Sequence, residues 1–175
     1  MILYPNEYFN SVTEISYDYL KQKKINALIL DVDNTLIDYD KNLSEDIIKW
    51  AEELKKKDIK LIILSNSNNK EKVKAVANKL EINFEYFGTK PLKRGFKKVK
   101  KILDEKNENI AVVGDQIFTD VIGANRMKMY SILVEPIAEK DIWITKVKRP
   151  IENYIKNKYL ETKEEKWNIS MMYIF

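Results

Sequence analysis

Six side chains with acidic, hydroxyl or amine groups follow short apolar runs in this 175-residue sequence, and together they could perform chemistry. They are Asp31, Asp33, Ser65, Lys90, Asp115 and Asp120. Clustered carboxylates repel one another, and a hard cation such as Mg²⁺ relieves the repulsion because it takes oxygen ligands. A phosphate ester would be attracted to that cation, to the Lys90 ammonium and to the Ser65 hydroxyl. The set therefore favours phosphoryl transfer.

Each of these residues also has a plain structural interpretation. An Asp at a strand end is often a turn former or a helix cap, Ser65 could cap a helix, and Lys90 is one of 31 basic residues. Asp31 and Asp33 are two residues apart, so on a strand their side chains would point the same way, about 6.6 Å apart. The joint order of the groups at one predicted sheet edge is what favours a site.

The residue types that the sequence lacks exclude several kinds of enzyme. There is no His and no Cys, which rules out an imidazole base, a thiolate nucleophile, a disulfide and an iron–sulfur cluster. The four glycines form neither G-x-G-x-x-G nor a P-loop. The chemistry must therefore use Asp, Glu, Lys, Ser, Thr or a hard metal ion.

Short apolar runs alternate with helical patterns from residue 25 onward. The predicted strands are 27–30, 59–64, 84–87, 110–113 and 131–134, and the predicted helices between them are 44–54, 73–80, 92–103 and 119–127. This alternation predicts an α/β fold with a doubly wound, Rossmann-like, five-stranded parallel sheet and helices on both faces. Ligands of such sheets bind outside the carboxyl ends of the strands, where the candidate residues fall.

Three regions are predicted along the chain. Residues 1–23 form an N-terminal helical segment, 24–135 form the core, and 136–175 form a basic, aromatic extension in which Pro150 opens a final helix. No apolar run is long enough to span a bilayer, and the first ten residues do not resemble a signal peptide. We therefore expect a cytoplasmic protein.

The segment from Asp31 to Thr35 reads D-V-D-N-T and resembles the first motif, D-x-D-x-T, of the haloacid dehalogenase (HAD) superfamily. The second, third and fourth motifs are matched in order by Ser65, Lys90, Asp115 and Asp120. The resemblance covers residues 24–135. The Lys90-Pro91 pair and the G-D-Q segment that begins at Gly114 are similar to the capless subfamily IIIA, which includes YqeG-type proteins and mitochondrial-type phosphatidylglycerophosphate phosphatases.

The resemblance implies a phosphomonoester hydrolase with an aspartyl-phosphate intermediate. Asp31 would be the nucleophile, and Asp33 would protonate the leaving alcohol and then deprotonate water. Mg²⁺ would be held by the Asp31 carboxylate, the Asp33 carbonyl and Asp115. Lys90 would stabilise the charge on nucleophile and phosphate, with Lys93 as a weaker rival. Branches of the superfamily that cleave carbon–halogen or carbon–phosphorus bonds lack the second acid.

The same resemblance gives supporting roles to further residues. Ser65 and Asn66 would bind phosphoryl oxygens, and Arg126 would contact substrate. Thr35 would brace the first loop, and Asp120 would support the water shell of the metal or orient Lys90.

The resemblance to subfamily IIIA implies phosphatidylglycerophosphate as the substrate, and two features of the sequence lend weaker support. Neither 38–60 nor 67–89 has room for a cap domain, and an uncapped site suits a large substrate such as a lipid headgroup, a protein or a nucleic acid end. Between Lys146 and Lys158 five basic residues and one acid give a local charge of +4, equal to that of the whole chain. Such a segment suits peripheral contact with an anionic inner membrane surface through 143–159, or packs its aromatics on the core.

Several alternatives remain at this point. The enzyme could act on a nucleotide, sugar or protein phosphate. A phospho-Asp signalling receiver also gathers acids and a Lys, but there the Lys follows the last acidic group. A non-catalytic binding domain is a third alternative. A nucleic acid partner is not expected from the mild net charge of +4. The apolar terminus 167–175 could dock on the core, contact a membrane or mediate self-association.

Overall fold

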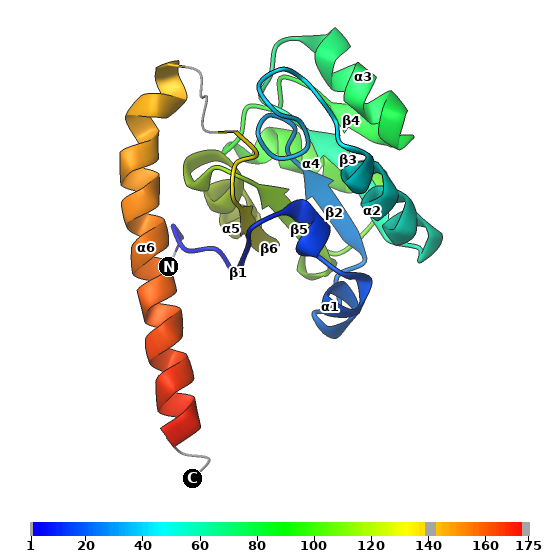
Figure 1. Ribbon diagram of the computed structural model, residues 1–175. Coiled ribbons are helices and arrows are strands. Elements are labelled where there is room, and N and C mark those ends of the chain that lie inside the picture. Colours follow the sequence, from blue (N-terminus) through cyan, green and yellow to red (C-terminus); the bar gives the residue numbers. More distant parts are fainter. Residues whose placement is uncertain (1, 139–142, 173–175) are drawn as a thin grey trace.

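The computed structural model describes residues 2–138 and 143–172, with the side chains of the last helix described over 150–164. In these residues six parallel strands form one sheet, in the order β1-β6-β5-β2-β3-β4 (Figure 1). The strands are β1 (Glu7–Phe9), β2 (Ala27–Leu30), β3 (Lys60–Leu64), β4 (Asn83–Glu85), β5 (Ile110–Gly114) and β6 (Tyr130–Val134). The chain winds from β2 toward β4 on one side and through β5 to β6 on the other, so the order reverses between β2 and β5.

Helices cover both faces of the sheet (Figure 1). Strand β2 is buried throughout, and its side chains alternate between two apolar clusters. Leu28 and Leu30 pack with α2 (Glu45–Lys56) and α3 (Lys70–Leu80). Ala27 and Ile29 pack with α4 (Lys93–Leu103) and α5 (Ile122–Met127) on the opposite face. The predicted doubly wound α/β architecture is therefore confirmed.

The sheet has six strands, not the five predicted. The additional strand, β1, lies at the edge and pairs in parallel with β6, with Glu7 opposite Ile132 and Phe9 opposite Val134. The segment expected to be helical thus begins with a strand, followed by the 3₁₀ turn Val12–Glu14 and α1 (Tyr17–Gln22). Three residues are too few to show the alternation of apolar and polar side chains that indicates a strand. This segment is therefore a strand because it pairs with β6.

The segment after β5 departs from a simple helix. Residues 119–127 were predicted as one short helix, but Ile117–Val121 form a π-helical turn, η3, which leads into α5. Such turns insert one extra residue into the helical ladder and are frequent at functional sites. Here the turn carries the buried Asp120.

The last helix, α6 (Trp143–Met172), stands beside the sheet edge at the N-terminus (Figure 1). The expectation that Pro150 opens this helix is wrong, because the helix begins at Trp143 and continues through the proline. A proline ring fixes φ near the helical value, so Pro150 removes one hydrogen-bond donor without ending the helix. No helix in the described part of the chain has the length and apolar character needed to cross a membrane.

Contacts from the described side chains of α6 join it to the core. The Tyr159 hydroxyl donates to the Asn6 carbonyl over 3.3 Å, and its ring meets the Tyr4 ring edge-on, with centroids 5.8 Å apart. Lys156 pairs with Glu135 just after β6. This half of the extension therefore packs on the core.

Candidate active site

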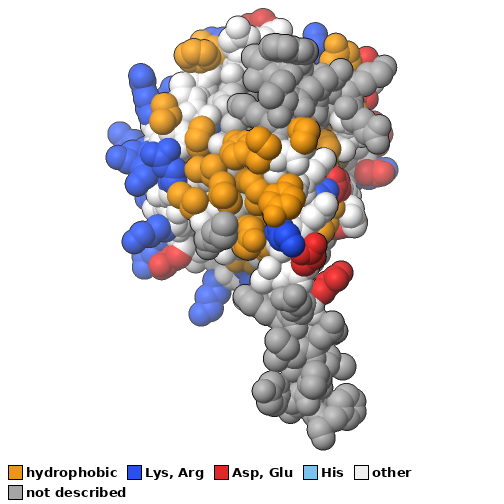
Figure 2. Space-filling view, turned by 90° about the vertical axis from the view of Figure 1, so that its left-hand side faces the viewer, with side chains coloured by type: hydrophobic (Ala, Val, Ile, Leu, Met, Phe, Trp, Pro, Cys, Tyr) orange, Lys and Arg blue, Asp and Glu red, His pale blue; other side chains and the backbone are white. Residues whose placement is uncertain are grey.

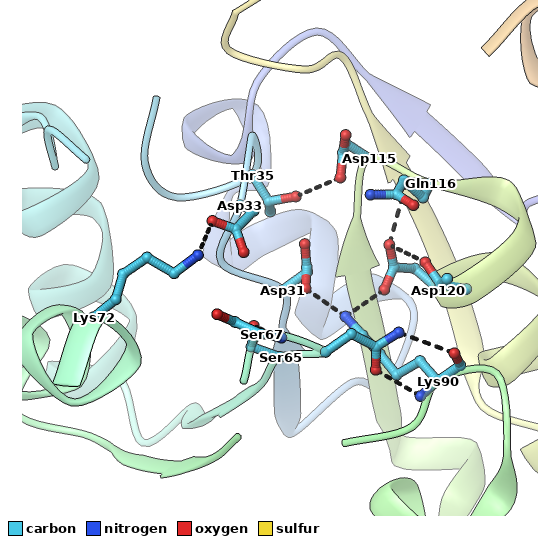
Figure 3. A network of polar contacts seen from close by, with 12 residues as sticks. Asp31, Asp33, Thr35, Ser65, Ser67, Lys72, Lys90, Asp115, Gln116 and Asp120 are labelled. Carbon is cyan, nitrogen blue, oxygen red and sulfur yellow. Dashed lines mark hydrogen bonds and ion pairs between the residues drawn. The ribbon is translucent and has the colours of Figure 1, made fainter. Parts of the chain in front are cut away.

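The candidate residues lie just beyond the carboxyl ends of three neighbouring strands (Figure 3). Asp31 follows β2, Ser65 follows β3 and Asp115 follows β5. Because β2 lies between β3 and β5, the three loops meet at the point where the strand order reverses. That position is where open α/β sheets bind their ligands.

Lys90 joins two of these carboxylates in the interior. Its Nζ lies 2.5 Å from Asp31 Oδ1 and 2.7 Å from Asp120 Oδ1. The three side chains are only 2%, 8% and 1% exposed for Lys90, Asp31 and Asp120. Lys93, the alternative lysine, is exposed at the start of α4. The structure thus brings Lys90 and not Lys93 to the carboxylates.

The pKa values of this cluster depend on burial and on the neighbouring charges. Burial raises the pKa of the Asp31 carboxyl to about 7, although the Lys90 ammonium opposes that rise. The negative charge of Asp120 adds to it. Burial alone would lower the pKa of Lys90, but the Asp120 and Asp31 carboxylates outweigh it and leave the pKa above its usual value. Lys90 is therefore a fixed cation.

The side chain of Asn66 holds the backbone of Lys90 in place. The Asn66 side-chain amide donates to the Lys90 carbonyl over 2.9 Å, and the Lys90 N–H donates to Asn66 Oδ1 over 2.7 Å. The following peptide bond, Lys90–Pro91, is cis. Arg126 lies exposed on α5 and donates to the Pro91 carbonyl over 3.4 Å, so it contacts this loop and not the carboxylates.

A divalent cation fits the carboxylate cluster. Oxygens of Asp31, Asp115 and Asp120, all buried, lie within 4.8 Å of one another. When ionised, the three carboxylates carry more negative charge than Lys90 neutralises, and an oxygen-only donor set suits a hard ion. Thr35 supports the set, because its hydroxyl donates to Asp115 Oδ1 over 3.4 Å.

Asp120 is tied to its own turn as well as to Lys90. Its Oδ2 accepts from the Gln116 N–H over 3.2 Å and from the Thr119 hydroxyl over 3.3 Å. A Cβ at Gly114 would collide with the Asp120 carboxylate, so only glycine allows this close approach. Asp120 is therefore held in a position where it orients Lys90.

The loop after β3 supplies hydroxyl and amide groups. Ser65 is buried, and its Oγ accepts from the Ser67 N–H over 3.1 Å. Ser67 Oγ in turn accepts from the Asn69 N–H over 3.2 Å. The Asn69 side chain caps α3 by accepting from the Lys72 N–H over 3.0 Å. These turns fix the loop and the first turn of α3 beside the carboxylates.

Lys72 is the residue that sequence reasoning missed. Its Nζ lies 2.5 Å from Asp33 Oδ1, and the Lys72 and Asp33 side chains are 15% and 42% exposed. Figure 3 shows Lys72 reaching Asp33 from α3, away from Lys90. Only its place in the first turn of the helix that follows the Ser65 loop could have signalled this contact.

Comparisons with known proteins assign the chain to a family. Residues 2–138 match the family model described as mitochondrial PGP phosphatase. The chain belongs to this family. A relative from Bacillus subtilis, "Probable phosphatase YqeG", is 38% identical over 152 residues, which cover 86% of this chain and 88% of the relative. As a member of the mitochondrial PGP phosphatase family, the chain is a HAD-type phosphatase and so a hydrolase.

Solved structures agree on the fold of this family member. An uncharacterized protein from Listeria monocytogenes serotype 4b matches with a TM-score of 0.55 at 20% identity. The match covers 67% of this chain and 85% of the Listeria chain. A protein from Streptomyces avermitilis named as a HAD family hydrolase has a TM-score of 0.53 at 21% identity, covering 67% and 70%. The Rossmann-like HAD fold is therefore confirmed.

Proposed function

We propose that the protein is a Mg²⁺-dependent phosphomonoester hydrolase that acts on phosphatidylglycerophosphate through a phosphorylated Asp31. The observation that carries this proposal is the buried group formed by Asp31, Lys90 and Asp120. Asp115 lies beside this group, and Asp33 lies next to it at the solvent-exposed side. A nucleophilic carboxylate, a fixed cation and an adjacent acid are what a covalent phosphatase needs.

The reaction proceeds in two displacements. A carboxylate oxygen of Asp31 forms a bond to phosphorus while the bond to the leaving oxygen breaks, and Asp33 gives its proton to that oxygen. Asp33 then takes a proton from water, whose oxygen attacks phosphorus and releases phosphate and free Asp31. Lys90 orients Asp31 through its 2.5 Å contact and balances the charge on the phosphoryl oxygens. Ser65 and the amides of its loop bind those oxygens.

The metal has a defined place in this proposal. Asp31, Asp115 and the Asp33 carbonyl would hold Mg²⁺, and Asp120 would support it from the side of Lys90. The bound ion would neutralise the carboxylates and the phosphoryl group together.

The family match and the surface around the site support a lipid substrate. The matching family is described as mitochondrial PGP phosphatase, and we take PGP to stand for phosphatidylglycerophosphate. In the described residues no inserted domain lies between β2 and α2 or between β3 and α3. The exposed Ile137 lies beside the first loop, because its N–H donates to the Asn34 carbonyl over 2.9 Å, and the exposed Tyr39 follows in that loop. Apolar side chains beside an open site suit an interface with lipid.

A second apolar surface lies on the side of α6. Figure 2 shows apolar side chains gathered on this face, with Lys and Arg side chains beside them. Exposed apolar residues of the N-terminus and α6 include Ile2, Ile151 and Tyr154. Of the five basic residues between positions 146 and 158, Lys156 and Lys158 have described side chains, whereas Lys146, Lys148 and Arg149 lie outside that description.

The test compares kcat/KM for phosphatidylglycerophosphate in mixed micelles with that for p-nitrophenyl phosphate and a nucleoside monophosphate. We expect the lipid to be preferred by at least a hundredfold, because remote contacts with a lipid supply binding energy that small esters cannot. Asp31→Asn should remove activity on all three substrates. Efficient hydrolysis of a soluble metabolite, with no action on the lipid, would contradict the substrate and leave the HAD-type phosphatase unchanged.

A further inference from the structure

Lys72 and Lys90 contact different carboxylates at the candidate site. Lys90 is buried against Asp31 and Asp120, whereas Lys72 contacts Asp33, whose side chain is 42% exposed. Figure 3 shows that the two lysines approach the carboxylates from different elements, Lys72 from α3. They can therefore serve different parts of a substrate.

The side of the substrate on which Lys72 lies can be inferred from the role of Asp33. This step rests on the proposed function, in which Asp33 transfers the proton. If Asp33 transfers the proton to the leaving oxygen, its carboxyl lies beside the leaving group. The Lys72 ammonium, 2.5 Å from that carboxyl, must then lie on the leaving-group side as well. Lys90 contacts the nucleophile and so lies on the side of the transferred phosphoryl group.

The ammonium of Lys72 can change its partner. Lysine carries its charge on a flexible stem, and this charge is not enclosed, because the pair with Asp33 is open to solvent on the Asp33 side. An anion on the leaving group would attract Lys72 while a neutral alcohol would not. The leaving group of phosphatidylglycerophosphate carries such an anion, since its phosphodiester sits at the other end of the glycerol that bears the scissile ester.

We propose that Lys72 forms a second anion-binding subsite, which selects phosphomonoesters whose leaving group carries a further phosphate. Its binding energy acts on a part of the substrate that does not react. Lys72 is therefore a specificity-determining residue for the class of leaving group. The subsite does not depend on acyl chains, so it acts on lipid and soluble substrates alike.

The test uses two soluble substrates that differ by one phosphodiester. Glycerophosphoglycerol phosphate, the deacylated lipid headgroup, carries the anion on its leaving group, and glycerol 3-phosphate leaves as neutral glycerol. The readout is the ratio of their kcat/KM values, measured on the full chain. Loss of the contact between Lys72 and Asp33 would change kcat/KM for both substrates by the same factor. A change in the ratio therefore reports the contact between Lys72 and the phosphodiester of the leaving group.

We expect the wild type to favour the charged substrate at least tenfold. Lys72→Met should reduce that ratio by about tenfold, equivalent to about 1.4 kcal/mol, chiefly through a higher KM for the charged substrate. Lys72→Arg should retain most of the preference. Lys74→Met removes an exposed lysine from the same helix and should leave the ratio unchanged.

Two results would overturn the subsite. One is a wild type with no preference for the charged substrate, and the other is a Lys72→Met variant that loses activity on both substrates by the same factor. Failure of the lipid substrate gives a result distinct from failure of the subsite. In that case the wild type would hydrolyse the deacylated headgroup but not the lipid in micelles. Thermal melting of each variant shows whether it is folded.

Discussion

Lys90 determines the electrostatics of the candidate site. It is enclosed with Asp31 and Asp120, and its ammonium is the cation that both carboxylates share. Buried ion groups of this kind add little to stability overall, but removal of one partner is costly because the remaining charges stay buried. The arrangement therefore indicates a cluster kept for its chemistry.

Replacement of Lys90 by Met should lower both stability and turnover. The free energy of unfolding should fall by about 3–5 kcal/mol, because Asp31 and Asp120 lose their shared partner. Urea denaturation at pH 8 in EDTA measures the change without metal. Lys93→Met is the matched control at an exposed position and should shift stability by no more than about 0.5 kcal/mol. Equal effects of the two substitutions would contradict the assignment of Lys90.

Metal binding should depend on Asp115. We expect Mg²⁺ to raise the melting temperature of the wild type, since a ligand that binds only the folded state stabilises it by about 2.7 kcal/mol at a concentration of 100 Kd. Asp115→Asn keeps the shape of the side chain and removes its charge, so the shift should shrink several-fold. EDTA should abolish turnover. A thermal shift of equal size in both proteins would remove Asp115 from the ligand set.

At the scale of elements, the π-helical turn η3 links α6 to the site. The Phe118 N–H in this turn donates to Glu152 Oε1 over 3.0 Å, and Glu152 is buried on α6. The same turn carries Asp120, which contacts Lys90. The C-terminal helix therefore supports the segment that orients Lys90.

Glu152→Ala should weaken this support. The Phe118 N–H would lose its acceptor, which costs about 1–3 kcal/mol of stability for a buried group, and kcat should fall as Asp120 loses its fixed position. Glu152→Gln retains an acceptor oxygen and should keep most of the activity. Asn153→Ala serves as the control, because Asn153 follows Glu152 on the same helix and is exposed. If Glu152→Ala matched this control in melting temperature and kcat, α6 would have no part in positioning the turn.

The same elements explain what the sequence could predict. Strands β2, β3 and β5 are apolar runs of four or five residues that end in polar groups, so both their type and the sheet edge were predictable. Strand β1 has three residues and depends on pairing with β6, which no local pattern encodes. Lys72 is similar, because its role arises from a contact with Asp33, 39 positions away in the chain.

At the scale of the whole molecule, one chain carries both an open site and a basic segment, residues 146–158. Each Lys or Arg near an anionic membrane contributes on the order of 1 kcal/mol, and salt weakens the attraction. If the extension contacts membrane, its charge should matter for lipid substrates alone.

Replacement of the five basic residues between positions 146 and 158 by Gln should lower kcat/KM for phosphatidylglycerophosphate in anionic vesicles. The five are Lys146, Lys148, Arg149, Lys156 and Lys158. Activity on p-nitrophenyl phosphate should stay within about twofold, because a small soluble ester does not have to be reached at a membrane surface. Rising salt should reduce the lipid activity of the wild type more than that of the variant. Equal losses on both substrates would instead indicate a structural role for the extension.

The most direct test of the central claim is detection of phosphate on Asp31. In Asp33→Asn, p-nitrophenyl phosphate should still phosphorylate the protein, since nitrophenolate leaves without a proton, but water would lack its base. We predict a burst of about one nitrophenol per protein molecule and, after acid quench, a phosphorylated peptide that contains Asp31. Absence of the burst and of the phosphopeptide, or phosphate on Ser65 instead, would contradict the account.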